Sequence, residues 1–194
     1  MNATVEDIGG DVSRRDFLYL ATGAFAAIGA AGALWPLVDQ MNPDASALSL
    51  ATIEIDITPV QTGQAVTVLW RGMPIFVRNL TAEEVEKGKA ADVSDLKDPV
   101  ARLLGSTAEL PATAANITKA GKDNWLVAVG ICTHLGCVPK GQNPGDPRGP
   151  FGGYFCVCHG SVYDTLGRVR SGPAPRNLDI PPYEFIGETK IKLG

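Results

Sequence analysis

The sequence predicts a mainly β domain that follows a single transmembrane helix. The chain has 194 residues, a length that suits one domain with an appendage. Residues 17–38 form a run of 22 without a charged side chain, as expected of a membrane-spanning helix. From about residue 51 onwards apolar and polar residues alternate, which is the pattern of half-buried strands.

Composition excludes several classes of protein before any motif is considered. The net charge of −4 argues against nucleic acid as a partner, and 45% hydrophobic against 20% charged residues argues against a disordered chain. Four cysteines are too few for a disulfide scaffold in a chain of this length. The two histidines, His134 and His159, exclude any mechanism that needs three or more imidazoles.

Residues 1–16 are polar and are predicted to lie in the cytoplasm. They end in Ser13-Arg14-Arg15-Asp16, which continues into Phe17-Leu18 and resembles the twin-arginine export signal S-R-R-x-F-L-K. Tyr19 departs from that signal at its last place. The twin-arginine route carries proteins that are already folded, so it suits a chain whose cofactor is inserted in the cytoplasm.

A helix over residues 17–38 would be roughly 33 Å long, enough to cross a hydrocarbon core. The arginine pair on its amino side keeps the N-terminus in the cytoplasm, so the rest of the chain would be exported. We therefore expect a single-pass protein of a bacterial inner membrane with its main domain on the periplasmic side. Ala31-Gly32-Ala33 also fits a signal-peptide cleavage site, and the sequence leaves anchor and cleaved signal both open.

Residues 39–50 are predicted to be a flexible linker, because Asn42 to Leu50 are mostly small and polar. The main domain then covers residues 51–194. Its first strand is predicted where Ile53, Ile55 and Ile57 alternate with polar residues. Two more strands are predicted over 65–70 and 75–78, about a turn at Arg71-Gly72.

Residues 81–123 are predicted to form a helical insertion. Thr81 and Glu84 have the spacing of a capping box, which begins a short helix. Residues 92–104 predict a second helix, and residues 111–123 predict a loop. Two strands are predicted beyond the insertion, over 125–131 and 189–193.

All four cysteines and both histidines lie in two short boxes. The first box, residues 132–137, contains Cys-Thr-His-Leu-Gly-Cys, and the second box, residues 156–161, contains Cys-Val-Cys-His-Gly-Ser. Unconnected buried thiols and core histidines would not cluster in this way, so the boxes predict a metal site. The candidate ligands are Cys132, His134, Cys137, Cys156, Cys158 and His159.

Three ligand sets are compatible with the boxes. A zinc site takes four ligands and leaves two candidates over. A cluster held by four cysteines leaves both histidines without a role. The third set places Cys132 and Cys156 on one iron and the two histidines on a second iron. That set leaves Cys137 and Cys158 to pair as a disulfide, which would persist in an oxidising compartment.

The boxes resemble those of the Rieske iron–sulfur proteins, which hold a 2Fe–2S cluster by two cysteines and two histidines. The resemblance extends to Tyr163, two residues after Ser161. It also extends to Gly172-Pro173-Ala174-Pro175, which looks like the family's proline loop beneath the cluster. With the twin-arginine anchor, the chain looks like the Rieske subunit of a bacterial cytochrome bc complex, a ubiquinol–cytochrome c reductase. The resemblance is weakest across residues 81–123.

The resemblance implies a fold, a cofactor and a ligand set. The fold is an antiparallel β-sandwich with a small cluster-binding subdomain at about residues 130–175. The cofactor is one 2Fe–2S cluster. The implied ligands are Cys132, His134, Cys156 and His159, and the implied disulfide joins Cys137 and Cys158.

The resemblance also implies roles for the neighbouring side chains. Ser161 and Tyr163 would donate hydrogen bonds to sulfur and stabilise the reduced state. Leu135 would cover the cluster and dock at the quinol pocket. His159 and His134 would contact the quinol, because each binds iron through one ring nitrogen and can expose the other. Histidine ligation itself raises the reduction potential, to about −150 to +300 mV.

The implied partners are a cytochrome b subunit with its ubiquinol, a cytochrome c subunit whose haem receives the electron, and membrane lipid, in a dimeric complex. The linker at 42–50 would let the main domain move between the two subunits. The chain is then one subunit of a proton-translocating respiratory enzyme and has no complete active site alone.

Two positions depart from the family pattern without altering a ligand. Val157 stands where the second box usually has proline, and Val162 stands where a polar residue or histidine is frequent. Proline fixes φ and lacks an N–H, so Val157 makes the loop freer. We expect a modest effect on the stability or potential of the cluster.

Other functions are weighed against this interpretation. A Rieske oxygenase needs a mononuclear iron on two further histidines, and none remains. A carrier ferredoxin would lack the membrane segment. The photosynthetic cytochrome complex has a shorter loop between the boxes than residues 138–155. The Rieske small subunit of an arsenite oxidase differs chiefly in its partner, and a structural zinc domain would hold no iron.

Overall fold

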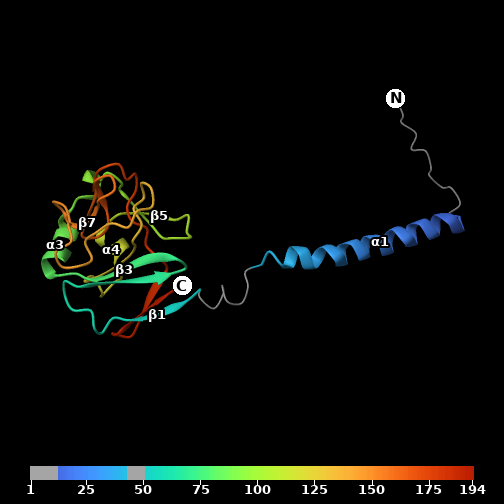
Figure 1. Ribbon diagram of the computed structural model, residues 1–194, viewed down its shortest axis with the longest axis horizontal. Helices are drawn as coiled ribbons and strands as arrows, with labels where there is room; N and C mark the ends of the chain where they lie inside the picture. The colour runs from blue at the N-terminus through green and yellow to red at the C-terminus, as the bar shows by residue number, and fades with distance from the viewer. Residues whose placement is uncertain (1–12, 43–50) are drawn as a thin grey trace, which may run out of the picture. The chain divides into compact units, whose positions relative to one another are not determined.

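The computed structural model describes residues 13–42 and 51–194. The chain separates into two compact units, Met1–Leu48 and Ser49–Gly194, here called the anchor unit and the main domain. Figure 1 shows the anchor unit as one long helix, α1, and the main domain as short strands with a few helical turns.

Helix α1 (Arg14–Asp39) begins within the twin-arginine sequence, because a capping box closes its first turn. The Ser13 hydroxyl accepts a hydrogen bond from the Asp16 N–H at 3.2 Å, and the Asp16 carboxylate accepts one from the Ser13 N–H at 3.0 Å. The helix predicted over 17–38 is therefore found, and it starts earlier than its uncharged run.

Helix α1 is the one described helix that is long and apolar enough to cross a membrane. None of its residues is buried, and Leu20 and Phe25 are 76% and 74% exposed. Large apolar side chains exposed all round a helix need lipid or another apolar surface. This geometry fits the predicted single-pass anchor. The linker predicted over 39–50 lies mostly outside the described residues.

The main domain contains four antiparallel sheets in its described part. Their strand orders are β1-β11-β10, β2-β3-β6, β4-β5 and β7-β8-β9. Three helical segments accompany them: α3 (Ala82–Ala90), the 3₁₀ turn η1 (Val93–Asp95) and α4 (Ala114–Ile117). The strands are β1 (Ile53–Asp56), β2 (Ala65–Trp70), β3 (Met73–Asn79), β4 (Val100–Arg102), β5 (Glu109–Pro111), β6 (Trp125–Val129), β7 (Gly152–Cys156), β8 (Ser161–Asp164), β9 (Val169–Ser171), β10 (Tyr183–Ile186) and β11 (Lys190–Leu193).

The core is centred on β3 and β6. Phe76 on β3 and Leu126 on β6 are fully buried, as are Ile75, Val77 and Val127 beside them. Strand β3 lies between β2 and β6, so it is hydrogen-bonded on both edges. The turn at Arg71-Gly72 joins β2 to β3 with positive φ at both residues, 51° and 75°. This is the backbone that a two-residue hairpin turn requires.

The mainly β prediction is confirmed, and the five predicted strands are found as β1, β2, β3, β6 and β11. The capping box at Thr81 is also confirmed. The Thr81 hydroxyl accepts from the Glu84 N–H at 3.2 Å, and helix α3 follows.

The helix predicted over 92–104 is wrong. The Asp92 carboxylate caps only the 3₁₀ turn η1, and Leu96 is already extended. Pro99 lacks the N–H that a continuing helix would need. Residues 100–102 instead form β4, which pairs with β5. The loop predicted over 111–123 contains the one-turn helix α4. The insertion thus contains the β4–β5 hairpin as well as helical segments.

Four strands, β7 to β10, are not among the predicted strands. Strand β8 is Ser-Val-Tyr-Asp, which does not alternate between apolar and polar residues, and it is buried at every position. Strand β9 has only three residues. These strands position both ends of the second box, because β7 ends at Cys156 and β8 begins at Ser161.

A buried arginine joins the insertion over 81–123 to the β7-β8-β9 sheet. Arg168 lies in the turn between β8 and β9 and is 1% exposed. Its Nε donates to the Asp164 carboxylate at 2.7 Å. Its two Nη atoms donate to the carbonyls of Ala112 at 3.2 Å and Gly88 at 2.8 Å. One guanidinium therefore holds three segments together.

Replacing this guanidinium tests its structural role. Arg168→Met is expected to destabilise the main domain by about 3–5 kcal/mol, because it leaves the Asp164 carboxylate buried without its main partner. Unfolding of the full chain in detergent, followed by circular dichroism, measures the loss. The control is Lys190→Met, since Lys190 makes an exposed ion pair with Glu54 at 3.0 Å and such pairs contribute little. Equal losses in both variants would contradict the assignment.

Candidate functional site

The two boxes form the same turn, which brings their ligands together. In the first box the Gly136 N–H donates to the Cys132 carbonyl at 2.9 Å, and in the second the Gly160 N–H donates to the Cys156 carbonyl at 2.9 Å. Both glycines have positive φ, 83° and 77°, a conformation that glycine adopts without steric cost. Each loop therefore folds back onto its first cysteine.

Four of the predicted ligands meet at this point. Cys132 and Cys156 are buried and carry free thiols. The rings of His134 and His159 lie 4.7 Å apart between centroids, with their planes at 84°. The thiols thus lie inside and the imidazoles lie nearer the surface.

The environment of the histidines fits a metal site. His134 Nδ1 is buried and has no hydrogen-bond partner in the described structure. A buried nitrogen without a partner is costly, and a bound metal would satisfy it. His159 is exposed. Two thiols with two imidazoles are the donor set of a 2Fe–2S cluster of the Rieske type, so these residues fit that group.

The structure joins Cys137 and Cys158 in a disulfide. The sulfur atoms of Cys137, Cys156 and Cys158 all lie within 4.8 Å of one another. Two of these three atoms are bonded to each other and offer no thiolate to a metal. The disulfide therefore removes the four-cysteine alternative and connects the two boxes covalently.

A tyrosine hydroxyl bridges the first box from below. Tyr163 Oη donates to Cys132 Sγ at 3.2 Å and accepts from the Thr133 N–H at 3.3 Å. Tyr163 is fully buried on β8. Burial raises the pKa of Tyr163, so its hydroxyl keeps the proton that it donates.

Hydrogen bonds distinguish the two buried thiols. Burial alone raises the pKa of a thiol, and the pKa of Cys156 accordingly lies above its ordinary value. At Cys132 burial acts in the same direction, but hydrogen bonds outweigh it and the pKa lies below its ordinary value. The Tyr163 hydroxyl lowers this pKa most, and the His134 N–H, the Cys156 thiol and the Ser161 hydroxyl act in the same direction.

Residues 172–175, the proline loop, pack directly against the second box. Gly172 has φ +89°, and a Cβ at this position would lie 2.5 Å from the Ser161 Cα. Only glycine allows the loop to approach so closely. The Ala174 N–H then donates to Ser161 Oγ at 3.0 Å. Ser161 itself is buried, and it lies opposite Cys156 in the pairing of β7 with β8.

The outer surface of the site is apolar. Leu135 and Val157, one from each box, are 70% and 55% exposed, and Val138 is also exposed. Large exposed apolar side chains that gather beside polar groups are typical of an interaction surface. Val157, the residue in the usual place of proline, therefore lies on the surface of the site and not beneath it.

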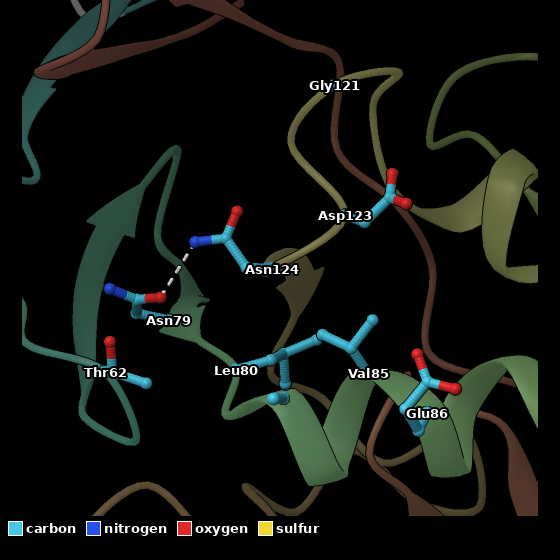
Figure 2. Close-up of a pocket in the computed structure, with 9 residues that line it drawn as sticks. Thr62, Asn79, Leu80, Val85, Glu86, Gly121, Asp123 and Asn124 are labelled. Atoms are coloured by element: carbon cyan, nitrogen blue, oxygen red, sulfur yellow. Dashed lines mark hydrogen bonds between the residues drawn. The ribbon is translucent and has the colours of Figure 1, made fainter.

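The cavity in Figure 2 is separate from these boxes. It has a volume of about 480 Å³ and lies at the start of α3, beside the loop that contains Asp123. The Asn124 side chain donates to Asn79 Oδ1 at 3.0 Å across it. None of the predicted site residues lines this cavity. The candidate site is thus separate from this cavity, with its thiols buried and His159 exposed.

Sequence reasoning missed one functional contact inside the first box. Thr133 Oγ1 donates to the Arg176 carbonyl at 2.6 Å and accepts from the Arg176 N–H at 3.3 Å. The residue lies between two ligands, but the pattern of the box gives no sign of a partner 43 positions away.

Comparisons with known proteins agree with this geometry. Residues 80–184 match the model of the Rieske [2Fe-2S] domain. Residues 4–44 match the model described as the ubiquitinol-cytochrome C reductase Fe-S subunit TAT signal.

Curated relatives extend over almost the whole chain. The ubiquinol-cytochrome c reductase iron-sulfur subunit of Rhodospirillum rubrum is 49% identical, with 98% of this chain and 97% of the relative covered. That of Blastochloris viridis is 51% identical, with 95% and 94% covered. A solved structure titled "Hyperthermophilic respiratory Complex III" has 29% identity, a TM-score of 0.47, and coverage of 89% of this chain and 98% of its own.

Family membership implies one 2Fe–2S cluster, and the two thiols and two imidazoles described above provide its donor set. The chain belongs to the family of Rieske iron–sulfur subunits of ubiquinol–cytochrome c reductase.

Proposed function

We propose that this chain carries single electrons from ubiquinol at a cytochrome b subunit to the haem of a cytochrome c subunit. The observation that carries the proposal is the meeting of two buried free thiols and two imidazoles in the paired loops of the two boxes. The names of the relatives support the same reaction. The chain acts as one subunit and relies on its partners for the quinol pocket and the haem.

In this proposal Cys132 and Cys156 would hold one iron, and His134 and His159 would hold the other. The buried Nδ1 of His134, which has no hydrogen-bond partner among the described residues, would be its metal-binding atom. The cluster, when bound, supplies a one-electron acceptor whose potential histidine ligation raises. Cys137 and Cys158 keep the loops together and take no part in ligation.

The exposed imidazole of His159 receives the quinol in this mechanism. A ring nitrogen that is free of metal can accept a hydrogen bond from the quinol hydroxyl and take its proton. His134 is less exposed, so His159 is the better placed of the two. By taking the proton, the His159 imidazole would avoid leaving an uncompensated charge on the quinol in an apolar pocket.

Leu135 and Val157 serve as the docking surface for the cytochrome b subunit. Both are exposed apolar residues beside the histidines, so their burial against a partner would exclude water from the hydrogen bond to quinol. We further propose that α1 anchors the chain in a bacterial inner membrane, with the main domain on the periplasmic side of a dimeric complex. The apolar helix and the matched export signal support this placement.

A redox titration tests the proposed function. The full-length chain in membranes is expected to give a rhombic EPR signal and a midpoint potential in the upper part of the range of about −150 to +300 mV. The potential should fall as the pH rises above neutrality, because reduction favours proton binding at the imidazoles. A low potential that does not change with pH would indicate a ferredoxin-like carrier. Stoichiometric zinc without iron would exclude electron transfer.

Removing one hydroxyl tests how the site sets its potential. Tyr163→Phe deletes the donor to Cys132 Sγ and is expected to lower the midpoint potential by about 60 mV. A hydrogen bond to a charged group contributes about 1.5 kcal/mol, and 59 mV corresponds to a tenfold change for one electron. The control is Tyr183→Phe, because the buried Tyr183 hydroxyl has no partner among the described residues. An unchanged potential in Tyr163→Phe would show that the hydroxyl has no such role.

A further inference from the structure

Two consecutive residues of the insertion hold the proline loop from outside. Lys97 Nζ donates to the carbonyl of Gly172 at 2.6 Å and to that of Ala174 at 2.9 Å. Lys97 lies in the extended stretch between η1 and β4, where Leu96 and Asp98 are buried and Lys97 is exposed. Because side chains alternate along an extended chain, the same stretch presents an ammonium to the loop and a carboxylate to the interior.

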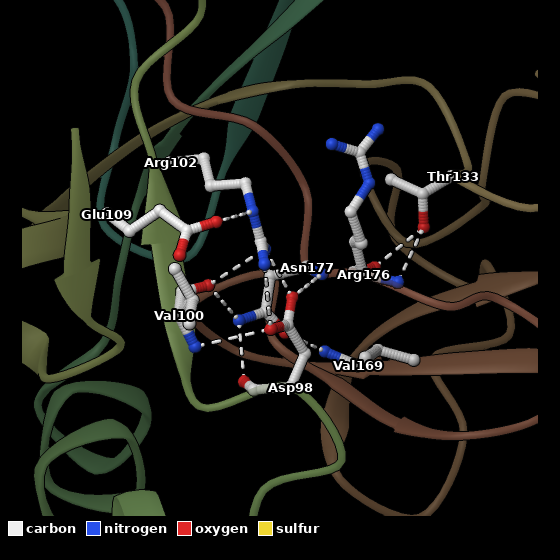
Figure 3. A network of polar contacts seen from close by, with 8 residues as sticks. All are labelled: Asp98, Val100, Arg102, Glu109, Thr133, Val169, Arg176 and Asn177. Atoms are coloured by element: carbon white, nitrogen blue, oxygen red, sulfur yellow. Dashed lines mark hydrogen bonds and ion pairs between the residues drawn. The ribbon is translucent and has the colours of Figure 1, made fainter. Parts of the chain in front are cut away.

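Asp98 holds the segment that follows the proline loop (Figure 3). Its carboxylate accepts from the Asn177 N–H at 2.9 Å, from the Val100 N–H at 3.2 Å, and from two guanidinium nitrogens of Arg102, the shorter contact being 2.6 Å. A carboxylate has about four such acceptor positions, so this one is fully used.

Asn177 completes the attachment from its own side. Its Nδ2 donates to the carbonyls of Asp98 and Val100, both at 2.9 Å, and its Oδ1 accepts from the Val169 N–H at 2.8 Å. Figure 3 shows this side chain between the insertion and strand β9. The backbone over residues 172–177 is therefore held at one end by Lys97 and at the other by Asp98.

The held segment touches both boxes of the cluster site. Its Ala174 N–H donates to Ser161 Oγ at 3.0 Å, and its Arg176 backbone pairs with the Thr133 side chain. When Ser161 Oγ accepts from Ala174, its own proton is free to point elsewhere, and Ser161 lies directly opposite the ligand Cys156 in the pairing of β7 with β8. The orientation of this hydroxyl thus depends on where the proline loop is held.

We infer that Lys97 and Asp98 are positioning residues for the cluster, which act through the proline loop on the Ser161 hydroxyl. The inference rests on the function proposed above and assigns to the insertion a part in setting the reduction potential. Lys97 contributes by its two hydrogen bonds to the loop and not only by its charge. The insertion is then a functional element of the site, although none of its residues contacts a ligand side chain in the described hydrogen bonds.

The first experiment removes the ammonium from the full-length chain in membranes. Lys97→Met is expected to lower the midpoint potential, shift the EPR g-values, and speed deuterium exchange in the peptide that contains Ala174. Lys97→Arg keeps two or more donors and should retain the wild-type values. Lys89→Met is the matched control, since Lys89 is an exposed lysine of the same insertion that pairs with Asp123 at 3.0 Å. It should change none of the three readouts.

A double-mutant cycle separates positioning from charge. In a Ser161→Ala background the hydroxyl is absent, so a Lys97→Met effect that runs through it should disappear. We expect the shift in potential to be at least about twofold smaller in that background, because coupled residues are not additive. Equal shifts in both backgrounds would leave only the loss of a positive charge and would overturn the inference.

The outcomes also distinguish this inference from the proposed function. A wild-type chain without iron or without a rhombic signal would defeat the function itself. A wild-type chain with the expected signal, together with an unchanged potential in Lys97→Met, would defeat only the positioning role. If Lys97→Met loses the cluster altogether, Lys97→Gln keeps one polar donor and takes its place in the same cycle.

Discussion

The disulfide between Cys137 and Cys158 is the constraint on which the rest of the site depends. The strands beneath the boxes have three to five residues, too few to hold two loops in register by backbone pairing alone. A covalent bond that closes a loop of 21 residues removes about 3 kcal/mol of chain entropy from the unfolded state. The bond also makes Cys137 and Cys158 unable to bind a metal, so Cys132 and Cys156 are the two cysteine ligands that remain. The same bond requires an oxidising environment, which agrees with an exported domain.

Hydrogen bonds from distant segments support the buried part of the site, which the disulfide does not reach. The disulfide connects the outer rims of the loops, whereas the buried thiols lie below them against Tyr163 and Ser161. Arg168 joins the sheet of the second box to the insertion, and Asp98 joins the insertion to the segment after the proline loop. The domain therefore surrounds its metal site with polar contacts between elements that are far apart in the chain. The contacts made by Tyr163, Arg168 and Asp98 are buried, where a lost partner costs the most.

Much of the site could be predicted from sequence because its information is local. Both boxes are six residues long, and their identical Cys-to-Gly spacing encodes the turn that brings the ligands together. The surrounding support could not be predicted in this way. Thr133 meets Arg176 and Lys97 meets Gly172 across 43 and 75 positions, and no pattern within either segment announces the other. The helix expected over 92–104 was wrong for a related reason, since pairing of β4 with β5 overrides the local pattern there.

Gly172 sets a limit on how this chain can vary over evolutionary time. A Cβ there would overlap the backbone of Ser161, and backbone cannot move aside as a flexible side chain can. Neighbouring positions can exchange residues gradually, through intermediates that still function, but this position has no such intermediate. The exposed side chains of the proline loop can therefore diverge. Gly172, the first residue of the loop, has to remain glycine, because no side chain fits at its Cα. The missing side chain of Gly172 makes no contact of its own, yet it restricts the sequence at this position more strictly than many contacts do.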